Sequence, residues 1–79
     1  MARDLYGEAR ALGASLWEVG LQQWASRLDE IVAGGTTATE ILMGVRWTLG
    51  ELLTQEPHLS PELRSRAEEL ATEIGRVLA

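Results

Sequence analysis

The sequence predicts an all-α protein: one domain over residues 1–79 that forms a small antiparallel bundle of three to four helices. Apolar residues recur every three or four positions along most of the chain, which is the spacing of one face of an α-helix. Capping residues, glycines and prolines divide this pattern into segments of helical length. No run alternates apolar and polar residues between turn signals, as a half-buried β-strand would.

The first two helices are expected at about residues 3–19 and 21–33, with a break or a kink near Gly20. At 100° per residue, the apolar stripe of the second segment is rotated from that of the first by about 110–120°. One straight helix would therefore turn half of its apolar side chains toward water. A helix bends or ends most easily at glycine, so Gly20 marks the junction. The alternative is one long helix whose stripe wraps around two different neighbours. The two stripes contain Leu5, Ala9, Leu12, Leu16 and Val19, and then Leu21, Trp24, Leu28, Ile31 and Val32.

The third helix is expected at about residues 38–55. Gly34 and Gly35 should end the preceding helix, because a left-handed glycine often follows the last helical turn. Thr37 and Glu40 have the spacing of a capping box, in which each side chain accepts a hydrogen bond from the backbone N–H of the other residue. This signal places the start of the third helix near residue 38.

The fourth helix is expected at about residues 61–78. Pro57 ends the third helix, because the residue before a proline is pushed out of the helical region. Ser60, Pro61 and Glu62 form a start signal: a capping hydroxyl, a proline at the first helical position and an acid near the positive end of the helix dipole. Short connections make consecutive helices antiparallel neighbours. The apolar face of this helix contains Leu63, Ala67, Leu70, Ile74, Val77 and Leu78.

The third helix differs from the others because it is apolar on two sides. One side is a normal core stripe, made of Ile41, Leu42, Val45, Leu49, Leu52 and Leu53. Opposite this stripe lie Met43, Trp47, Gly50 and Thr54, with Arg46 beside them. A helix that is apolar on two sides is expected to be buried on two sides.

Two explanations are open for the second apolar side. The third helix is either the central helix of the monomer, with Trp47 packed inside, or it forms the seam of a homodimer. Trp and Met are enriched at interface cores, and twofold dimers are the commonest assembly. Gly44 and Gly50 would let another backbone approach closely. The candidate interface consists of Met43, Arg46, Trp47, Gly50 and Thr54.

The length of the chain favours the dimer. A domain of 79 residues buries only about 60–65% of its unfolded surface, so its core is marginal without further support. Disulfides, metals and oligomerisation are the usual supports for small scaffolds. The chain has no cysteine and a single histidine, His58, which leaves self-association or unusually good helix packing.

No motif predicts an enzyme, a cofactor or a metal site. His58 lies in the connection before the fourth helix without a nucleophile or an acid in a recognisable motif. Glu68, Glu69 and Glu73 resemble a carboxylate cluster but lack the histidine of a helical di-metal site, so they are expected to be a solvated face. The glycines and threonines at residues 34–37 lack the ending of a phosphate loop. We therefore expect no catalytic residue.

Twelve acidic and seven basic residues give a net charge of −5, and the acids are spread along the chain. Without a basic patch, binding to nucleic acid is disfavoured, whereas a basic protein partner is compatible with an acidic surface. No apolar run is long enough to span a membrane, and we expect a cytoplasmic protein. All basic residues are Arg, and Lys, Asn, Phe and Cys are missing, a bias typical of a GC-rich bacterial or phage genome.

The sequence thus predicts a non-enzymatic protein–protein interaction module: a homodimeric, acidic helical protein that acts as an inhibitor, immunity protein or adaptor. The alternative is a helical module that binds a small apolar ligand, with Trp17, Trp24 and Trp47 around a cavity. Large apolar side chains around an enclosed space are typical of small-molecule sites.

Overall fold

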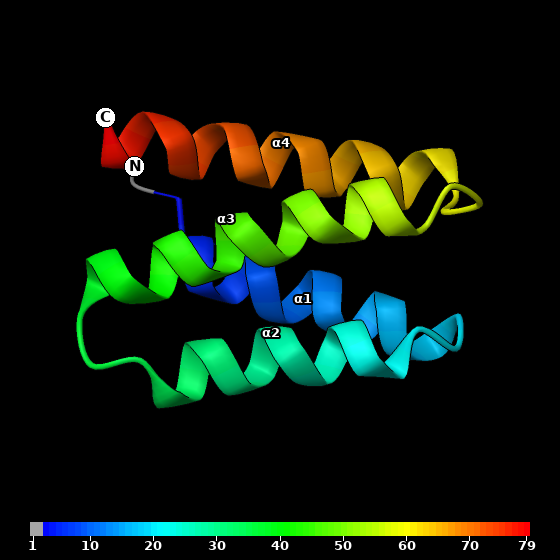
Figure 1. The fold of residues 1–79 in the computed structure, drawn as a ribbon, viewed down its shortest axis with the longest axis horizontal. Helices are drawn as coiled ribbons and strands as arrows, with labels where there is room; N and C mark the ends of the chain where they lie inside the picture. The colour runs from blue at the N-terminus through cyan, green and yellow to red at the C-terminus, as the bar shows by residue number, and fades with distance from the viewer. Residues whose placement is uncertain (1–2) are drawn as a thin grey trace.

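The computed structural model describes residues 3–79 and contains four helices in this range. They are α1 (Leu5–Glu18), α2 (Gln22–Gly34), α3 (Ala38–Gln55) and α4 (Pro61–Leu78). The helices run alternately in opposite directions around one core (Figure 1). Helix α3 packs against α2 and α4, and α1 packs against the same two helices. The predicted all-α antiparallel bundle is confirmed.

Of the predicted break or kink near Gly20, the structure shows a break, and the alternative of one long helix whose stripe wraps around two neighbours is wrong. Gly20 has a φ of 87°, the left-handed conformation that glycine adopts without strain. Its N–H donates to the carbonyl of Trp17 (3.1 Å), and the N–H of Leu21 donates to the carbonyl of Leu16 (2.9 Å). This pair of bonds is a Schellman motif, which satisfies the last carbonyls of α1. The next helix can therefore start in a new direction.

The end of α2 differs from the prediction. Gly34 is still helical, and Gly35 caps the helix with a φ of −72° in an extended conformation. Neither glycine is left-handed, because Gly20 has the only positive φ within residues 3–79. The Gly35 N–H nevertheless donates to the carbonyl of Ile31 (3.1 Å), so the helix end is satisfied without a left-handed turn.

Side-chain caps begin α3 and α4 at the predicted residues. The Thr37 hydroxyl accepts a hydrogen bond from the Glu40 N–H (3.1 Å), and the Ser60 hydroxyl accepts one from the Leu63 N–H (3.3 Å). Glu40 reaches back one residue further than in the predicted capping box: its carboxylate accepts from the N–H (3.2 Å) and the hydroxyl (2.6 Å) of Thr36. These bonds from Thr36 hold the pKa of Glu40 below its usual value.

The core lies between the four helices and is almost entirely aliphatic. Trp24 of α2 is its largest side chain, 1% exposed, and its Nε1–H donates to the Glu56 carboxylate at 3.0 Å. Two valines assigned to the apolar stripes are instead exposed. Val19 lies past the end of α1, and Val77 lies in the last turn of α4, where fewer helices surround it. The core contains Ala9, Leu12, Leu16, Trp24, Ala25, Leu28, Leu42, Val45, Leu49, Leu52, Leu59, Leu63, Ala67, Leu70 and Ile74.

Four buried residues lie outside the predicted stripes: Gly13, Ala25, Thr48 and Leu59. Leu59 belongs to the connection between α3 and α4 and covers that end of the core. Thr48, in the middle of α3, is 1% exposed, and its hydroxyl has no hydrogen-bond partner among the described residues. A buried hydroxyl without a partner destabilises a fold by about 1–3 kcal/mol. The Thr48 hydroxyl therefore lowers the stability of the core at the middle of α3.

Candidate interaction surface on α3

The two apolar sides of α3 have different fates in the monomer. The core stripe is buried at Leu42, Val45, Leu49 and Leu52, whereas Met43 and Trp47 on the other side are 58% and 64% exposed. The explanation that α3 is a central helix with Trp47 packed inside is therefore wrong. The bundle buries one apolar side of α3 and leaves the other one open.

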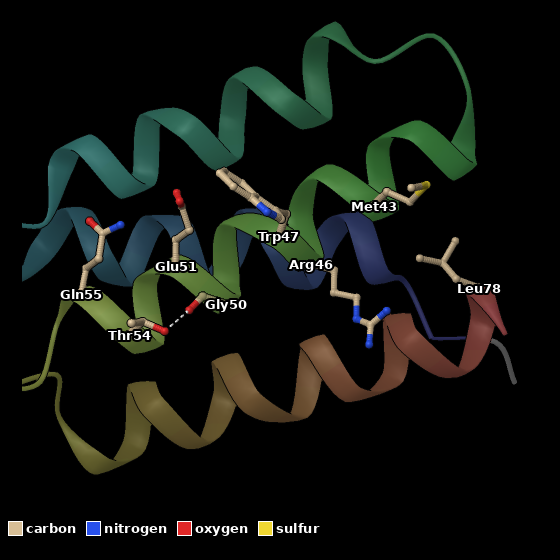
Figure 2. Close-up of a pocket in the computed structure, with 8 residues that line it drawn as sticks. All are labelled: Met43, Arg46, Trp47, Gly50, Glu51, Thr54, Gln55 and Leu78. Carbon is tan, nitrogen blue, oxygen red and sulfur yellow. Dashed lines mark hydrogen bonds between the residues drawn. The ribbon is translucent and has the colours of Figure 1, made fainter.

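The open side forms a shallow hollow of about 610 Å³ (Figure 2). We call the residues that line it the α3 surface: Met43, Arg46, Trp47, Gly50, Glu51, Thr54, Gln55 and Leu78. All five residues of the candidate interface belong to it. Three lining residues were not predicted. Glu51 and Gln55 lie on α3 beside the predicted residues, so helical periodicity could have indicated them. Leu78 comes from the end of α4, and no signal within α3 could have indicated it.

An arginine from α2 supports the indole of Trp47. The guanidinium carbon of Arg27 lies 5.9 Å from the centre of the Trp47 ring and 4.9 Å from that of Trp24. Arg27 also forms an ion pair with Glu51 (2.8 Å). Trp47 and Glu51 both point toward α2 (Figure 2). Cation–π contacts of this kind contribute about 0.5–1 kcal/mol at exposed sites, so Trp47 is held on one side while much of its surface remains in water.

Arg46 borders the opposite side of the hollow and points toward α4 (Figure 2). Its guanidinium lies over Gly75, where an added Cβ atom would be 3.3 Å from Nη2. Within residues 3–79, no carboxylate comes within 4.0 Å of Arg46. The α3 surface therefore carries one guanidinium that forms no ion pair in this part of the chain.

The two glycines inside α3 are used differently. A Cβ atom at Gly44 would come within 2.9 Å of Ile31 Cγ2, so this glycine lets α2 and α3 approach each other inside the monomer. A Cβ atom at Gly50 would meet nothing within 4 Å. The Gly50 carbonyl accepts a hydrogen bond from the Thr54 hydroxyl (2.9 Å; Figure 2), which leaves the methyl group of Thr54 as its free end. Gly50 is thus an open notch beside Trp47.

The three tryptophans do not surround one cavity, and that expectation is wrong. Trp24 is fully buried in the core. Trp17 is 53% exposed and lines a separate hollow between α1 and α2 with Ala25 and Asp29. Only Trp47 lines the hollow on α3. The helical rotation at Gly20 explains the separation, because it turns Trp24 inward and leaves Trp17 on the outer side of α1.

The remaining candidate residues are not assembled into a site. His58 is exposed in the connection between α3 and α4. Glu68 and Glu69 are exposed, while Glu73 forms ion pairs with Arg76 (3.2 Å) and Arg3 (3.5 Å). Across residues 3–79, no three His, Asp or Glu side chains are placed to hold a metal ion. In the turn at residues 34–37, the Thr36 N–H already donates to the Glu40 carboxylate.

None of the helices within the described range is long and apolar enough to cross a membrane. No family model, no curated protein and no solved structure matches this chain. The α3 surface offers two exposed apolar side chains, a guanidinium and an open notch on one face. These groups can bind another molecule through apolar contacts and an ion pair.

Proposed function

We propose that the protein is a non-enzymatic protein–protein interaction module that forms a homodimer through the α3 surface. The dimer acts as a small acidic inhibitor, immunity or adaptor protein in the cytoplasm. The observation that carries this proposal is the exposure of Trp47, 64%, next to Met43 on a helix whose other side already forms the core. Aromatic residues and methionine are enriched in the cores of interfaces.

The exposed indole alone supplies much of the energy that a dimer needs. Its exposed fraction leaves on the order of 150 Å² of Trp47 in contact with water. Two copies that cover each other's Trp47 would remove roughly 300 Å² from water, which favours association by about 7 kcal/mol. Losing translational and rotational freedom costs about 4–15 kcal/mol. Met43, which is 58% exposed, and the rest of the α3 surface would add to this contribution.

Charge favours a second copy over a basic protein at the α3 surface. The charged residues that line the hollow are Arg46 and Glu51, and Glu51 is paired with Arg27, so this face carries no excess of negative charge. The net charge of −5 therefore lies outside this surface. Two acidic chains repel each other least where they meet through a neutral face. A basic partner would gain little there and would be attracted to other parts of the protein.

Sedimentation equilibrium on the unmodified chain tests the dimer. We expect a species of twice the monomer mass of 8.7 kDa at tens of micromolar, and dissociation on dilution. A single 8.7 kDa species up to high micromolar concentration would disprove the homodimer.

The acidic remainder of the surface is the proposed site for a basic protein partner. Electrostatic attraction between the two should speed their association, and this advantage should fade as salt rises through about 0.15 M, where the Debye length is near 8 Å. The dimer should respond in the opposite way, because salt screens the repulsion between its two acidic chains. Stopped-flow association and sedimentation across a salt series measure both effects. An association rate that is indifferent to salt would mean that the acidity does not attract the partner.

A further inference from the structure

We propose that the two α3 helices of the dimer lie antiparallel, with the Trp47 indole of each copy seated over the partner's Gly50. This inference rests on the proposed homodimer and adds its geometry. Gly50 is the glycine of α3 that the monomer does not explain.

Gly50 weakens α3 without any visible benefit inside the chain. A glycine in the interior of a helix costs about 1 kcal/mol relative to alanine. Gly44 is explained by Ile31, whose Cγ2 would lie 2.9 Å from an added Cβ atom. At Gly50 a methyl group would meet nothing within 4 Å. Glycine allows the close approach of another molecule, so the missing side chain at Gly50 is explained if something outside the chain fills this space.

The α3 surface is complementary to itself when one copy is reversed. Along the helix, two large residues of this surface, Met43 and Trp47, are followed by two small ones, Gly50 and Thr54. A twofold axis between residues 48 and 49 places Trp47 opposite the partner's Gly50 and Met43 opposite the partner's Thr54. Each large side chain then meets a small one, which is how facing positions fill space at native density. The hydroxyl of Thr54 is already bonded to the Gly50 carbonyl, so Thr54 presents its methyl group to Met43.

A parallel pairing is the main alternative, and packing argues against it. It would place Trp47 against the partner's Trp47 and leave the two Gly50 residues facing each other across a void. Charge would favour it, because Arg46 could then reach the partner's Glu51 across the seam. Exposed ion pairs, however, contribute only about 0.2–1 kcal/mol each, and Glu51 is already paired with Arg27. Seating each indole over the partner's Gly50 avoids the void of the parallel register, and unfilled space in a packed interface is destabilising.

Gly50→Ala gives a test in which folding and assembly should change in opposite directions. The methyl group has space in the monomer and improves helix propensity, so thermal unfolding of the dilute monomer should shift to higher temperature. The same methyl group fills the notch, so the dissociation constant of the dimer should rise about tenfold or more. If the variant is more stable and dimerises as before, Gly50 receives no partner side chain and the inference is overturned. A dimer that tightens would overturn it as well.

Disulfide crosslinking tests the register independently of whether a dimer forms. The chain has no cysteine, so only the introduced cysteines can react. In the antiparallel register, the double variant Met43→Cys/Thr54→Cys should oxidise to a covalent dimer, whereas each single variant should not. Within one chain the two positions lie about 16 Å apart along the helix, too far for an internal disulfide. Crosslinking of Met43→Cys alone would show a parallel dimer, and a non-covalent dimer without any crosslink would show another interface. Either result overturns the register while the homodimer stands. A monomer in sedimentation overturns both.

Discussion

Trp47→Arg is expected to give a folded monomer. The side chain of Trp47 is mostly in water, and arginine is a good helix former, so the free energy of unfolding of the monomer should change by about 1 kcal/mol or less. In the dimer the substitution removes a buried aromatic anchor and brings a charge into the seam, where losses at central residues reach about 2–4 kcal/mol or more. The dissociation constant should therefore rise at least about thirtyfold. Circular dichroism and sedimentation on the same sample measure both quantities.

Trp17→Arg is the matched control. Trp17 is also more than half exposed, but it lies on α1 beside a different hollow. The control should keep both its helical content and its dimer. If Trp47→Arg remained a dimer of unchanged affinity, the α3 surface would not be the interface and the proposed function would fail. An unfolded Trp47→Arg chain would contradict the exposed position of this residue.

Trp24→Ala is expected to have the largest effect on folding. Trp24 is 1% exposed and contributes the bulk of the core next to α3. Truncation of a buried tryptophan costs about 3–5 kcal/mol. At about 0.05–0.15 kcal/mol per residue, the whole domain is stable by only about 4–12 kcal/mol. The variant should therefore unfold well below the melting temperature of the unmodified protein. Urea or thermal denaturation followed by circular dichroism measures this loss.

Trp24→Phe separates ring volume from hydrogen bonding at the same position. Phenylalanine keeps much of the buried ring but removes the donor that holds the Glu56 carboxylate at 3.0 Å. Its loss should be intermediate, about 1–3 kcal/mol. A cost below about 1 kcal/mol for Trp24→Ala would mean that α2 does not pack on the core as described, since large losses are diagnostic of buried positions.

Much of the secondary structure is determined by local sequence. The capping hydroxyls of Thr37 and Ser60 act on N–H groups three residues away, and Pro61 acts at its own position. Gly20 breaks the first helical region because no other residue type adopts its left-handed conformation so easily. These interactions span a few residues, so they can be predicted without knowing the rest of the fold. The grouping of Met43, Trp47, Gly50 and Thr54 on one face also follows from helical periodicity alone.

Only the tertiary structure decided which side of α3 is covered. The sequence indicates two apolar sides, but the number of helices packed against α3 determines how many of them are buried. Helices α2 and α4 flank the core stripe and leave Trp47 outside. The contacts that support the α3 surface join residues far apart in the chain: Arg27 stacks near Trp47, and Leu78 lines the same hollow. Gly44 and Gly50 are equivalent in the sequence, yet Ile31 fills the space at one and nothing fills it at the other. That difference depends on where α2 crosses α3, and no local preference of the chain specifies this crossing.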